Sequence, residues 1–219
     1  MRVIVIRHAQ TVWNAAGRAQ GQADPELSET GWRQCAEVAR RLAPVTIDSL
    51  WSSDLRRARD TAMAVAEQHP GLEVRLDPDL REINLGEWEG ADRKTLQRDW
   101  PDLYAAWQRR PSWDLVPGGE GSESFTARAT GCFGRIVAAA SSDQTVAVVT
   151  HIGLIRTILA TVVGADAGDL RWPWAIDNTG LTTLQGPADT GVWNTPALQV
   201  LAVNDTVHLG PLSRPAARL

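Results

Sequence analysis

The sequence predicts an α/β protein: a three-layer sandwich with a mostly parallel central sheet, helices on both faces and a small cap insertion. Short runs of apolar, often β-branched residues alternate with helical patterns, an alternation typical of parallel sheets. A stretch of different composition interrupts it at about 78–121. With 219 residues, 43% of them hydrophobic, the chain is long enough for one substantial core. We therefore expect a single domain, 1–219, with the cap insertion at about 78–121.

The first part of the chain alternates strands with helices. Three short apolar runs are predicted strands: Val3–Ile6, Ile47–Trp51 and Val74–Leu76. Two helical patterns lie between them. Ser28 is expected to cap the first helix, which stops near Pro44. Asp54 is expected to open the second helix, which ends at Pro70-Gly71.

The insertion and the second part of the chain differ in texture. Between Pro78 and Gly121, tryptophans crowd among charged residues, prolines and glycines, which predicts an irregular segment. Beyond it we expect helices over 123–140 and 154–163, the latter closed by Gly164, and strands over 145–150, 182–184 and 198–203. The last two strands are expected to pair.

Composition excludes several classes of function. The net charge is −4, so no basic field is available for nucleic acid or an anionic membrane. The apolar start runs directly into Arg7-His8 and is too short for a signal peptide. No stretch approaches the roughly 20 apolar residues of a membrane span. We expect a cytoplasmic protein with no nucleic-acid or membrane partner; a homodimer stays open.

The two cysteines, Cys35 and Cys132, are too few for a zinc quartet or a disulfide framework. Buried, reduced thiols are expected. The four histidines also divide into two groups. His69 and His208 are expected to be structural or solvent-facing, whereas His8 and His151 each follow a predicted strand.

Those two strand ends form the first candidate site. The strand Val3–Ile6 runs into Arg7-His8, and the strand 145–150 runs into His151. Ligands bind at the carboxyl edge of α/β sheets, where helix N-termini add positive potential, so both histidines are candidates for one site. Each is weak alone, because a single histidine beside a strand is more often a hydrogen-bonded structural residue.

Two further segments suit the same site. In Ser52–Ala58 a strand ends and a helix begins, and helix-start amides with Arg57 suit a phosphate. A solvated helix terminus is the alternative. The loop Arg81–Gly90 is dense in carboxylates and glycine. An ordinary surface turn is the alternative there.

Taken together, these segments resemble the histidine phosphatase superfamily, also called the phosphoglycerate mutase-like family. The resemblance follows the family order over nearly the whole chain. Its segments are Arg7–Thr11 with Trp13-Asn14, Gln20–Gln22, Leu27–Gly31, Ser52–Ala58 with Thr61-Ala62, Glu82–Gly90, Pro117–Glu120, and Thr150–Gly153 with Arg156. The chain departs from the family at Ala9, where glycine is usual, and at Gly121, where serine often follows Gly-Gly-Glu.

The resemblance implies a role for each matching residue. His8 would be the nucleophile, and Glu82 the proton donor. Arg7, Arg57 and His151 would surround the phosphoryl group. The further substrate-binding or supporting candidates are Thr11, Asn14, Gln20, Gly21 and Ile152.

These residue types suit phosphoryl transfer. Neutral imidazole attacks a doubly negative phosphomonoester without charge repulsion, and preorganised cations stabilise the phosphoryl oxygens. A carboxylic acid protonates the leaving group. His8 and His151 lack the paired carboxylates of a two-metal phosphatase, so neither a metal nor another cofactor is expected.

The resemblance implies a metal-independent phosphatase that hydrolyses a small phosphomonoester (sugar phosphate, phosphoglycerate-type or nucleotide-type) through a phosphohistidine. One alternative is a cofactor-dependent phosphoglycerate mutase, because Arg109-Arg110 faintly resemble the cap arginines of those enzymes. Another alternative is a non-catalytic phosphate-binding protein. The aromatic residues of the insertion pack a small core in one interpretation. In the other interpretation one or two of them line the pocket, together with Trp172 or Trp174. The aromatic residues of the insertion are Trp88, Trp100, Tyr104, Trp107 and Trp113.

Overall fold

The structure, a computed structural model, describes residues 1–167, 174–186 and 198–212. Its centre is a six-stranded sheet in the order β3-β2-β4-β1-β5-β6. The first four of these strands are parallel, β5 runs antiparallel to β1, and β6 antiparallel to β5. The strands are β1 (Arg2–Arg7), β2 (Ser49–Ser52), β3 (Val74–Leu76), β4 (Thr145–Thr150), β5 (Leu181–Gln185) and β6 (Gln199–Asp205). The mostly parallel sheet and the pairing of the last two strands are confirmed.

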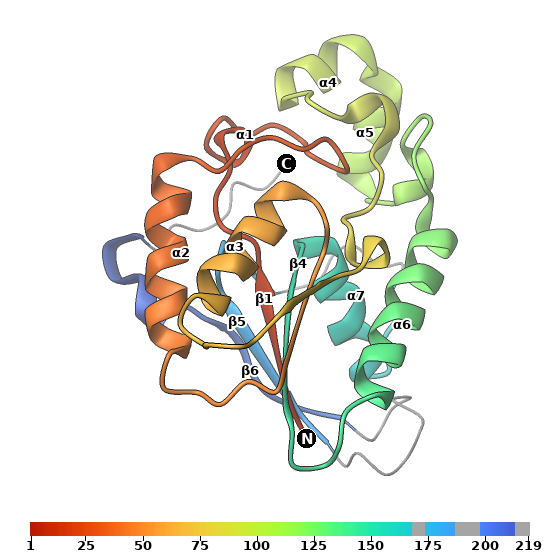
Figure 1. The fold of residues 1–219 in the computed structure, drawn as a ribbon. Helices are drawn as coiled ribbons and strands as arrows, with labels where there is room; N and C mark the ends of the chain where they lie inside the picture. The colour runs from red at the N-terminus through yellow and green to blue at the C-terminus, as the bar shows by residue number, and fades with distance from the viewer. Residues whose placement is uncertain (168–173, 187–197, 213–219) are drawn as a thin grey trace.

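Helices cover both faces of this sheet, with α2 and α3 on one side and α6 and α7 on the other (Figure 1). The helices are α1 (Val12–Ala15), α2 (Glu29–Leu42), α3 (Arg56–Ala66), α4 (Arg93–Asp99), α5 (Pro101–Arg109), α6 (Ser122–Ala138) and α7 (Ile152–Val162). Four short 3-10 turns complete the described structure: η1 (Pro78–Leu80), η2 (Gly86–Trp88), η3 (Trp113–Leu115) and η4 (Val207–Leu212).

The central strand β1 shows why three layers form. Val3 and Val5 pack into the core under α6 and α7, whereas Ile4 and Ile6 pack into the core under α2 and α3. Successive side chains of a strand point to opposite faces, so a run that is apolar throughout is buried on both. The continuous apolar run at the start of the sequence therefore predicts its own position in the middle of the sandwich.

One of two predicted helix caps differs from expectation. Ser28 caps α2, its hydroxyl accepting the amide of Gly31, as predicted. Asp54 does not cap α3: that helix begins at Arg56 with Leu55 at the cap position and no side-chain cap. Instead the Asp54 carboxylate accepts from Arg81, with 2.7 Å between Oδ1 and Nε. A salt bridge to a distant loop thus replaces the local cap that the sequence suggested.

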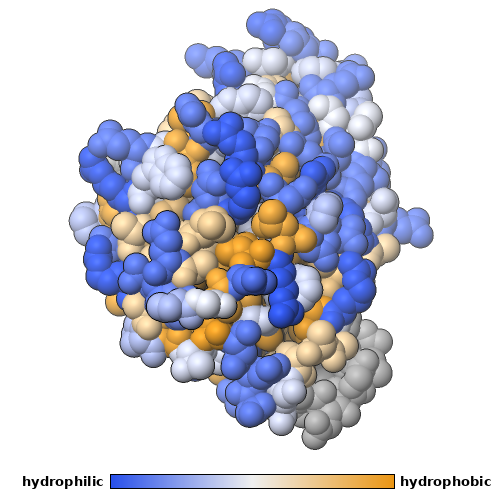
Figure 2. Space-filling model, viewed as in Figure 1, coloured by the Kyte–Doolittle hydropathy of each residue, from blue (hydrophilic) through white to orange (hydrophobic). Residues whose placement is uncertain are grey.

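The insertion is more regular than predicted, because α4 and α5 lie within it. These helices stand at the end of the molecule to which the parallel strands point (Figure 1). Their capping is local, since the Asp92 side chain accepts the amide of Thr95, and Pro101 begins α5. Over this part the visible surface is mostly hydrophilic (Figure 2).

The tryptophans of the insertion pack inward. Trp88 is buried, with ring centroids 5.4 Å from Trp107 and 6.4 Å from Tyr104, and Trp107 lies 4.9 Å from Trp113. Trp100 packs against the same core. This supports the small-core interpretation. Trp172 lies outside the described residues, and Trp174 packs half-buried against the core.

Both cysteines are buried and free of disulfides, as expected. The Cys35 thiol lies 3.8 Å from the Thr61 hydroxyl, and the Cys132 thiol 3.4 Å from a carboxylate oxygen of Asp77. Within the described ranges, no helix combines the length and apolar character needed to cross a bilayer.

Candidate active site

The pairing of β1 with β4 brings His8 and His151 together. Arg7 pairs with Thr150 at the ends of the strands, and the His8 amide donates to the Thr150 carbonyl at 2.9 Å. The residue that follows each of these two strands is a histidine. Their ring centroids are 5.1 Å apart, and both side chains are buried. The structure thus joins two histidines that lie 143 positions apart in the sequence.

Backbone carbonyls hold the two arginines in place. Arg57, from the first turn of α3, donates to the carbonyls of Gly21 and Ala23 at 2.7 and 2.6 Å. Arg7 donates to the carbonyl of Ile176 at 2.6 Å. In the part of the chain that the structure describes, the Nε atoms of both have no hydrogen-bond partner. Each guanidinium therefore keeps donor capacity for a further acceptor.

Burial lowers the pKa of Arg7 and of Arg57 to about 10, and the nearby Glu82 carboxylate opposes that shift. Both arginines therefore remain cationic at neutral pH. Two positive charges in a desolvated space, with one carboxylate, favour an anion there.

The same surroundings keep the histidines neutral. Burial, followed by the Arg57 charge, holds the pKa of His8 and of His151 well below the usual value. His8 Nδ1 lies 2.7 Å from the Ala9 carbonyl oxygen. A carbonyl only accepts, so this bond places the proton on Nδ1 and leaves the Nε2 lone pair free. His151 has no hydrogen-bond partner on either ring nitrogen among the described residues.

Glu82 reaches the same place from the loop after η1. Its carboxylate accepts the amide of Gly153 at 3.2 Å and the amide of Ile83 at 3.1 Å. Gly153 lies in the first turn of α7, two residues after His151. Only 9% of Glu82 is exposed. A carboxyl group thus stands at a helix N-terminus, beside two histidines and two arginines.

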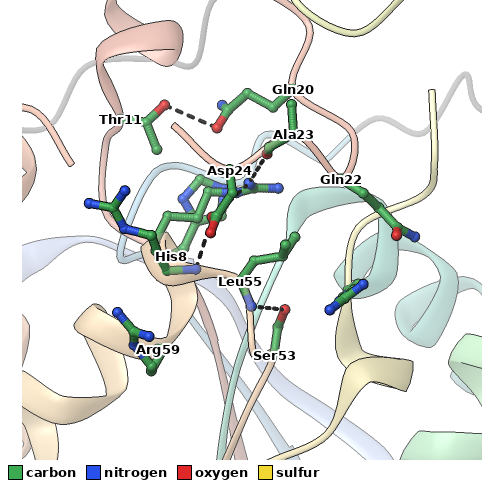
Figure 3. A network of polar contacts seen from close by, with 12 residues as sticks. His8, Thr11, Gln20, Gln22, Ala23, Asp24, Ser53, Leu55 and Arg59 are labelled. Carbon is green, nitrogen blue, oxygen red and sulfur yellow. Dashed lines mark hydrogen bonds and ion pairs between the residues drawn. The ribbon is translucent and has the colours of Figure 1, made fainter. Parts of the chain in front are cut away.

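The loop from Gln20 to Asp24 passes over His8, and Thr11 points toward Gln20 (Figure 3). The Thr11 hydroxyl donates to the Gln20 side chain at 3.0 Å and also caps α1, where it accepts the amide of Asn14. Gly21 contributes the carbonyl that accepts from Arg57. Thr11 therefore holds the Gln20 side chain, and Gly21 helps to hold Arg57.

Ile152 contributes differently. Its side chain packs half-buried against the core, so what it offers the site is a main-chain amide at the start of α7. Asn14 shares its side-chain oxygen with Asn178, whose amide nitrogen lies 3.4 Å away. Every candidate residue from the sequence therefore lies in or against one region.

Two residues that support the site were not singled out as site residues from the sequence. Thr61 accepts the amide of Ala9 at 3.0 Å and donates to the carbonyl of Arg57 at 2.6 Å, so it connects the segment after His8 to α3. Its position one helical turn after Arg57 is a usable signal. Asn178 donates to the His8 carbonyl at 2.9 Å, and no local pattern announces that contact.

The departure at Ala9 is accommodated. Ala9 is fully buried in a small cluster with Leu27 and Cys35, so its methyl group has a place beside His8. Across the described residues, no group of three or more histidine, cysteine, aspartate or glutamate side chains forms a metal site.

Comparison with known proteins gives a consistent result. The family model described as histidine phosphatase superfamily (branch 1) matches residues 3–197. A glucosyl-3-phosphoglycerate phosphatase of Mycobacterium tuberculosis is 36% identical over 197 residues, covering 84% of this chain and 85% of its own. A metal-independent phosphoserine phosphatase of Arabidopsis thaliana is 35% identical over 171 residues, covering 75% and 70%.

Solved structures agree with these matches. The mycobacterial glucosyl-3-phosphoglycerate phosphatase in complex with VO3 superposes with a TM-score of 0.80 at 32% identity, covering 93% of this chain and 98% of that chain. The shared fold therefore extends over nearly the whole molecule.

Proposed function

Because the chain belongs to the histidine phosphatase superfamily, branch 1, we propose that it is a metal-independent phosphatase that hydrolyses small phosphomonoesters through a phosphohistidine on His8. One observation carries the proposal. His8 is neutral, holds its proton on Nδ1 and lies in a buried space with two cationic guanidiniums. Such a space binds a phosphate dianion and presents a nitrogen lone pair to it.

In the first half-reaction, His8 Nε2 bonds to phosphorus and the bond from phosphorus to the ester oxygen breaks. Glu82, in its acid form, gives its proton to the departing oxygen. In the second half-reaction, water attacks the phosphohistidine and Glu82 accepts a water proton. The phosphorus–nitrogen bond then breaks, releasing inorganic phosphate and restoring His8.

The other residues bind and orient the phosphoryl group. Arg7, Arg57 and His151 would contact its oxygens, with the Ile152 amide at the start of α7 aimed at the same charge. Phosphate beside His151 favours the imidazolium and so raises its low pKa. The supporting groups are the side chains of Thr11, Asn14 and Gln20 and the main-chain carbonyl of Gly21.

Trapping the phosphoenzyme tests the proposal. Wild-type protein, quenched during turnover of a radiolabelled phosphomonoester, should carry acid-labile, base-stable phosphate. The His8→Ala variant should carry none and lose turnover, because no nucleophile remains. His69→Ala, a histidine outside the site, serves as control and should behave as wild type. Normal turnover by His8→Ala would refute the mechanism.

The names of the relatives indicate which substrates to test first. Glucosyl-3-phosphoglycerate and phosphoserine represent the sugar-type and small-acid-type esters, and a nucleoside monophosphate represents the nucleotide type. Phosphate release should survive EDTA. 3-Phosphoglycerate belongs in the panel because it separates hydrolysis from isomerisation. Arg109 and Arg110 are exposed at the end of α5, and isomerisation of 3-phosphoglycerate would favour the mutase alternative with these arginines as binding residues.

We also propose that the protein is cytoplasmic, which cell fractionation tests. Its molar mass in solution tests whether it forms a homodimer.

A further inference from the structure

Behind Glu82 lies an arginine that makes an unusual number of contacts. Arg128, on α6, forms a two-pronged ion pair with Glu120, with both N–O distances at 2.7 Å. The same guanidinium donates to the main-chain carbonyls of Asp79, Arg81 and Glu82 at 2.8, 2.9 and 3.3 Å. The side chains of Arg128 and Glu120 are only 17% and 14% exposed. All five hydrogen bonds that Arg128 donates therefore go to Glu120 or to the main chain of residues 79–82.

Glu120 holds the other end of that segment. Its carboxylate accepts the amide of Asn84 at 3.2 Å, and its own amide donates to the Asn84 carbonyl at 3.1 Å. The ion pair thus contacts the backbone on both sides of Glu82. Burying such a pair is costly unless hydrogen bonds satisfy its remaining donors and acceptors, and here they do.

The loop is fixed from the opposite side as well. The Gln22 side chain donates to the Glu82 carbonyl at 3.2 Å, and the Arg81 side chain is paired with Asp54. The backbone of the acid-bearing loop is thereby held between α6 on one side and the phosphate-binding loops on the other. A change in the Arg128 contacts would shift the loop relative to His8.

We propose that Arg128 and Glu120 are positioning residues that place the Glu82 carboxyl for proton transfer to the leaving oxygen. The inference rests on the proposed function, in which Glu82 is that acid. Arg128 touches no substrate. It acts through the carbonyls of residues 79, 81 and 82, whose geometry sets the direction of the Glu82 side chain.

Lysine cannot reproduce this arrangement. An ammonium group is a single point of charge, whereas the planar guanidinium has five donors in a fixed fork. Arg128→Lys therefore keeps the charge beside Glu120 and loses most of the carbonyl contacts. Glu120→Gln keeps the shape and removes the charge. These variants weaken the loop from its two ends with small changes in volume.

The test compares two substrates that differ in their need for an acid. Glycerol phosphate has an alkoxide leaving group that requires a proton, and p-nitrophenyl phosphate has a phenolate that does not. Displacement of a catalytic group by about 1 Å costs about 100-fold. We expect Arg128→Lys and Glu120→Gln to lower kcat on glycerol phosphate by about 10- to 100-fold. On p-nitrophenyl phosphate the loss should be under about threefold, with KM nearly unchanged because Arg7 and Arg57 keep their contacts.

The matched control is Arg135→Lys. Arg135 lies two turns further along α6 and pairs with the side chains of Asp77 and Asp79, but it is 61% exposed and contacts no carbonyl of the loop. It should show neither loss nor substrate contrast. Glu82→Gln is the reference and should show the contrast at its largest.

The outcomes separate the two claims. If Glu82→Gln shows the contrast and Arg128→Lys shows equal losses on both substrates, or behaves as Arg135→Lys does, the positioning role is overturned while the proposed function stands. If Glu82→Gln itself shows no contrast, the acid role fails and the inference fails with it. The inference is supported if Glu82→Gln, Arg128→Lys and Glu120→Gln each lower kcat more on glycerol phosphate than on p-nitrophenyl phosphate, and Arg135→Lys does not.

Discussion

At the scale of single residues, the absence of a side chain at Gly153 decides where Glu82 can lie. A Cβ atom built at Gly153 would stand 2.2 Å from the carboxylate oxygen of Glu82 and 3.3 Å from the ring of Phe125. The amide of Gly153 meanwhile donates to the same carboxylate. Gly153 therefore leaves room for the carboxyl of Glu82, the proposed acid, and also gives that carboxyl a hydrogen bond.

Gly153→Ala should consequently impair catalysis more than folding. The clashing oxygen is the end of a flexible side chain, so Glu82 can turn away at little cost, but the acid then leaves its position. We expect kcat on alkoxide substrates to fall by about tenfold or more. Activity and thermal denaturation assays on the same preparation measure both effects.

The control for that experiment is Gly131→Ala on α6. Leaving aside the helix backbone, the described atom nearest to a Cβ built there is an Arg135 nitrogen at 3.9 Å, and alanine in a helix interior is favoured over glycine by about 1 kcal/mol. It should retain activity and gain slight stability. Full activity in Gly153→Ala would show that the carboxyl does not need its present place.

At the scale of elements, strand β6 holds the loop of residues 176–178 against the site through Asn204. Asn204, at φ 56°, accepts the amide of Asp177 at 2.7 Å and donates to its carboxylate at 3.1 Å. The loop that it fixes supplies the Ile176 carbonyl to Arg7 and the Asn178 amide to the His8 carbonyl. Asparagine tolerates this left-handed backbone better than most residues and can also form both hydrogen bonds.

Asn204→Gly should separate those two properties. Glycine keeps the backbone conformation and loses both hydrogen bonds, which we expect to cost about 1–3 kcal/mol of unfolding free energy. Because Arg7 loses part of its support, KM for phosphomonoesters should rise several-fold. Urea unfolding and steady-state kinetics measure the two changes. An unaltered KM together with lowered stability would restrict Asn204 to a structural role.

The elements also show what a sequence reveals and what it conceals. The buried strands and the four long helices follow from apolar periodicity and caps such as Ser28, because these are local properties. Asp54 misled because its carboxylate satisfies a distant arginine instead of the nearest helix start. Likewise, nothing local reveals that Arg128 contacts the carbonyl of Glu82, 46 positions earlier.

The candidate site divides in the same way. The strand-end histidines with Arg7 could be expected together from the rule for parallel sheets, and Arg57 from its helix start, whereas the resemblance supplied their roles and Glu82. The contacts that hold them depend on tertiary packing: the spacing of Thr61 from Arg57 gives a signal for one of them, whereas no local pattern predicts the bond from Asn178. The sequence thus predicts the candidate site residues more readily than the hydrogen bonds that hold them.

At the scale of the whole molecule, burying two neutral histidines links stability to pH. The pKa of His8 and of His151 is held well below the usual value by burial, whereas in the unfolded chain it is about 6.5. Below pH of about 6.5 the unfolded chain therefore binds protons that the folded chain does not. The free energy of unfolding should fall as the pH decreases from there toward the lowered pKa values of the folded state.

Urea unfolding between pH 7 and pH 5 measures this dependence. The urea midpoint of the wild type should decrease over that range. In a His8→Gln/His151→Gln variant the decrease should be smaller, because both linked groups are gone. Equal slopes for the two proteins would show that other groups carry the pH dependence.

The buried cysteines have a consequence for the chemical robustness of the whole molecule. Burial raises the pKa of Cys35 to about 11 and that of Cys132 to about 12, so both thiols stay protonated at neutral pH. Alkylating reagents and peroxide attack thiolates, and this chain has no other cysteine. A phosphatase with a cysteine nucleophile is switched off by such oxidants. Because the proposed nucleophile is a nitrogen and both thiols are buried, we expect this protein to continue to turn over under oxidative stress.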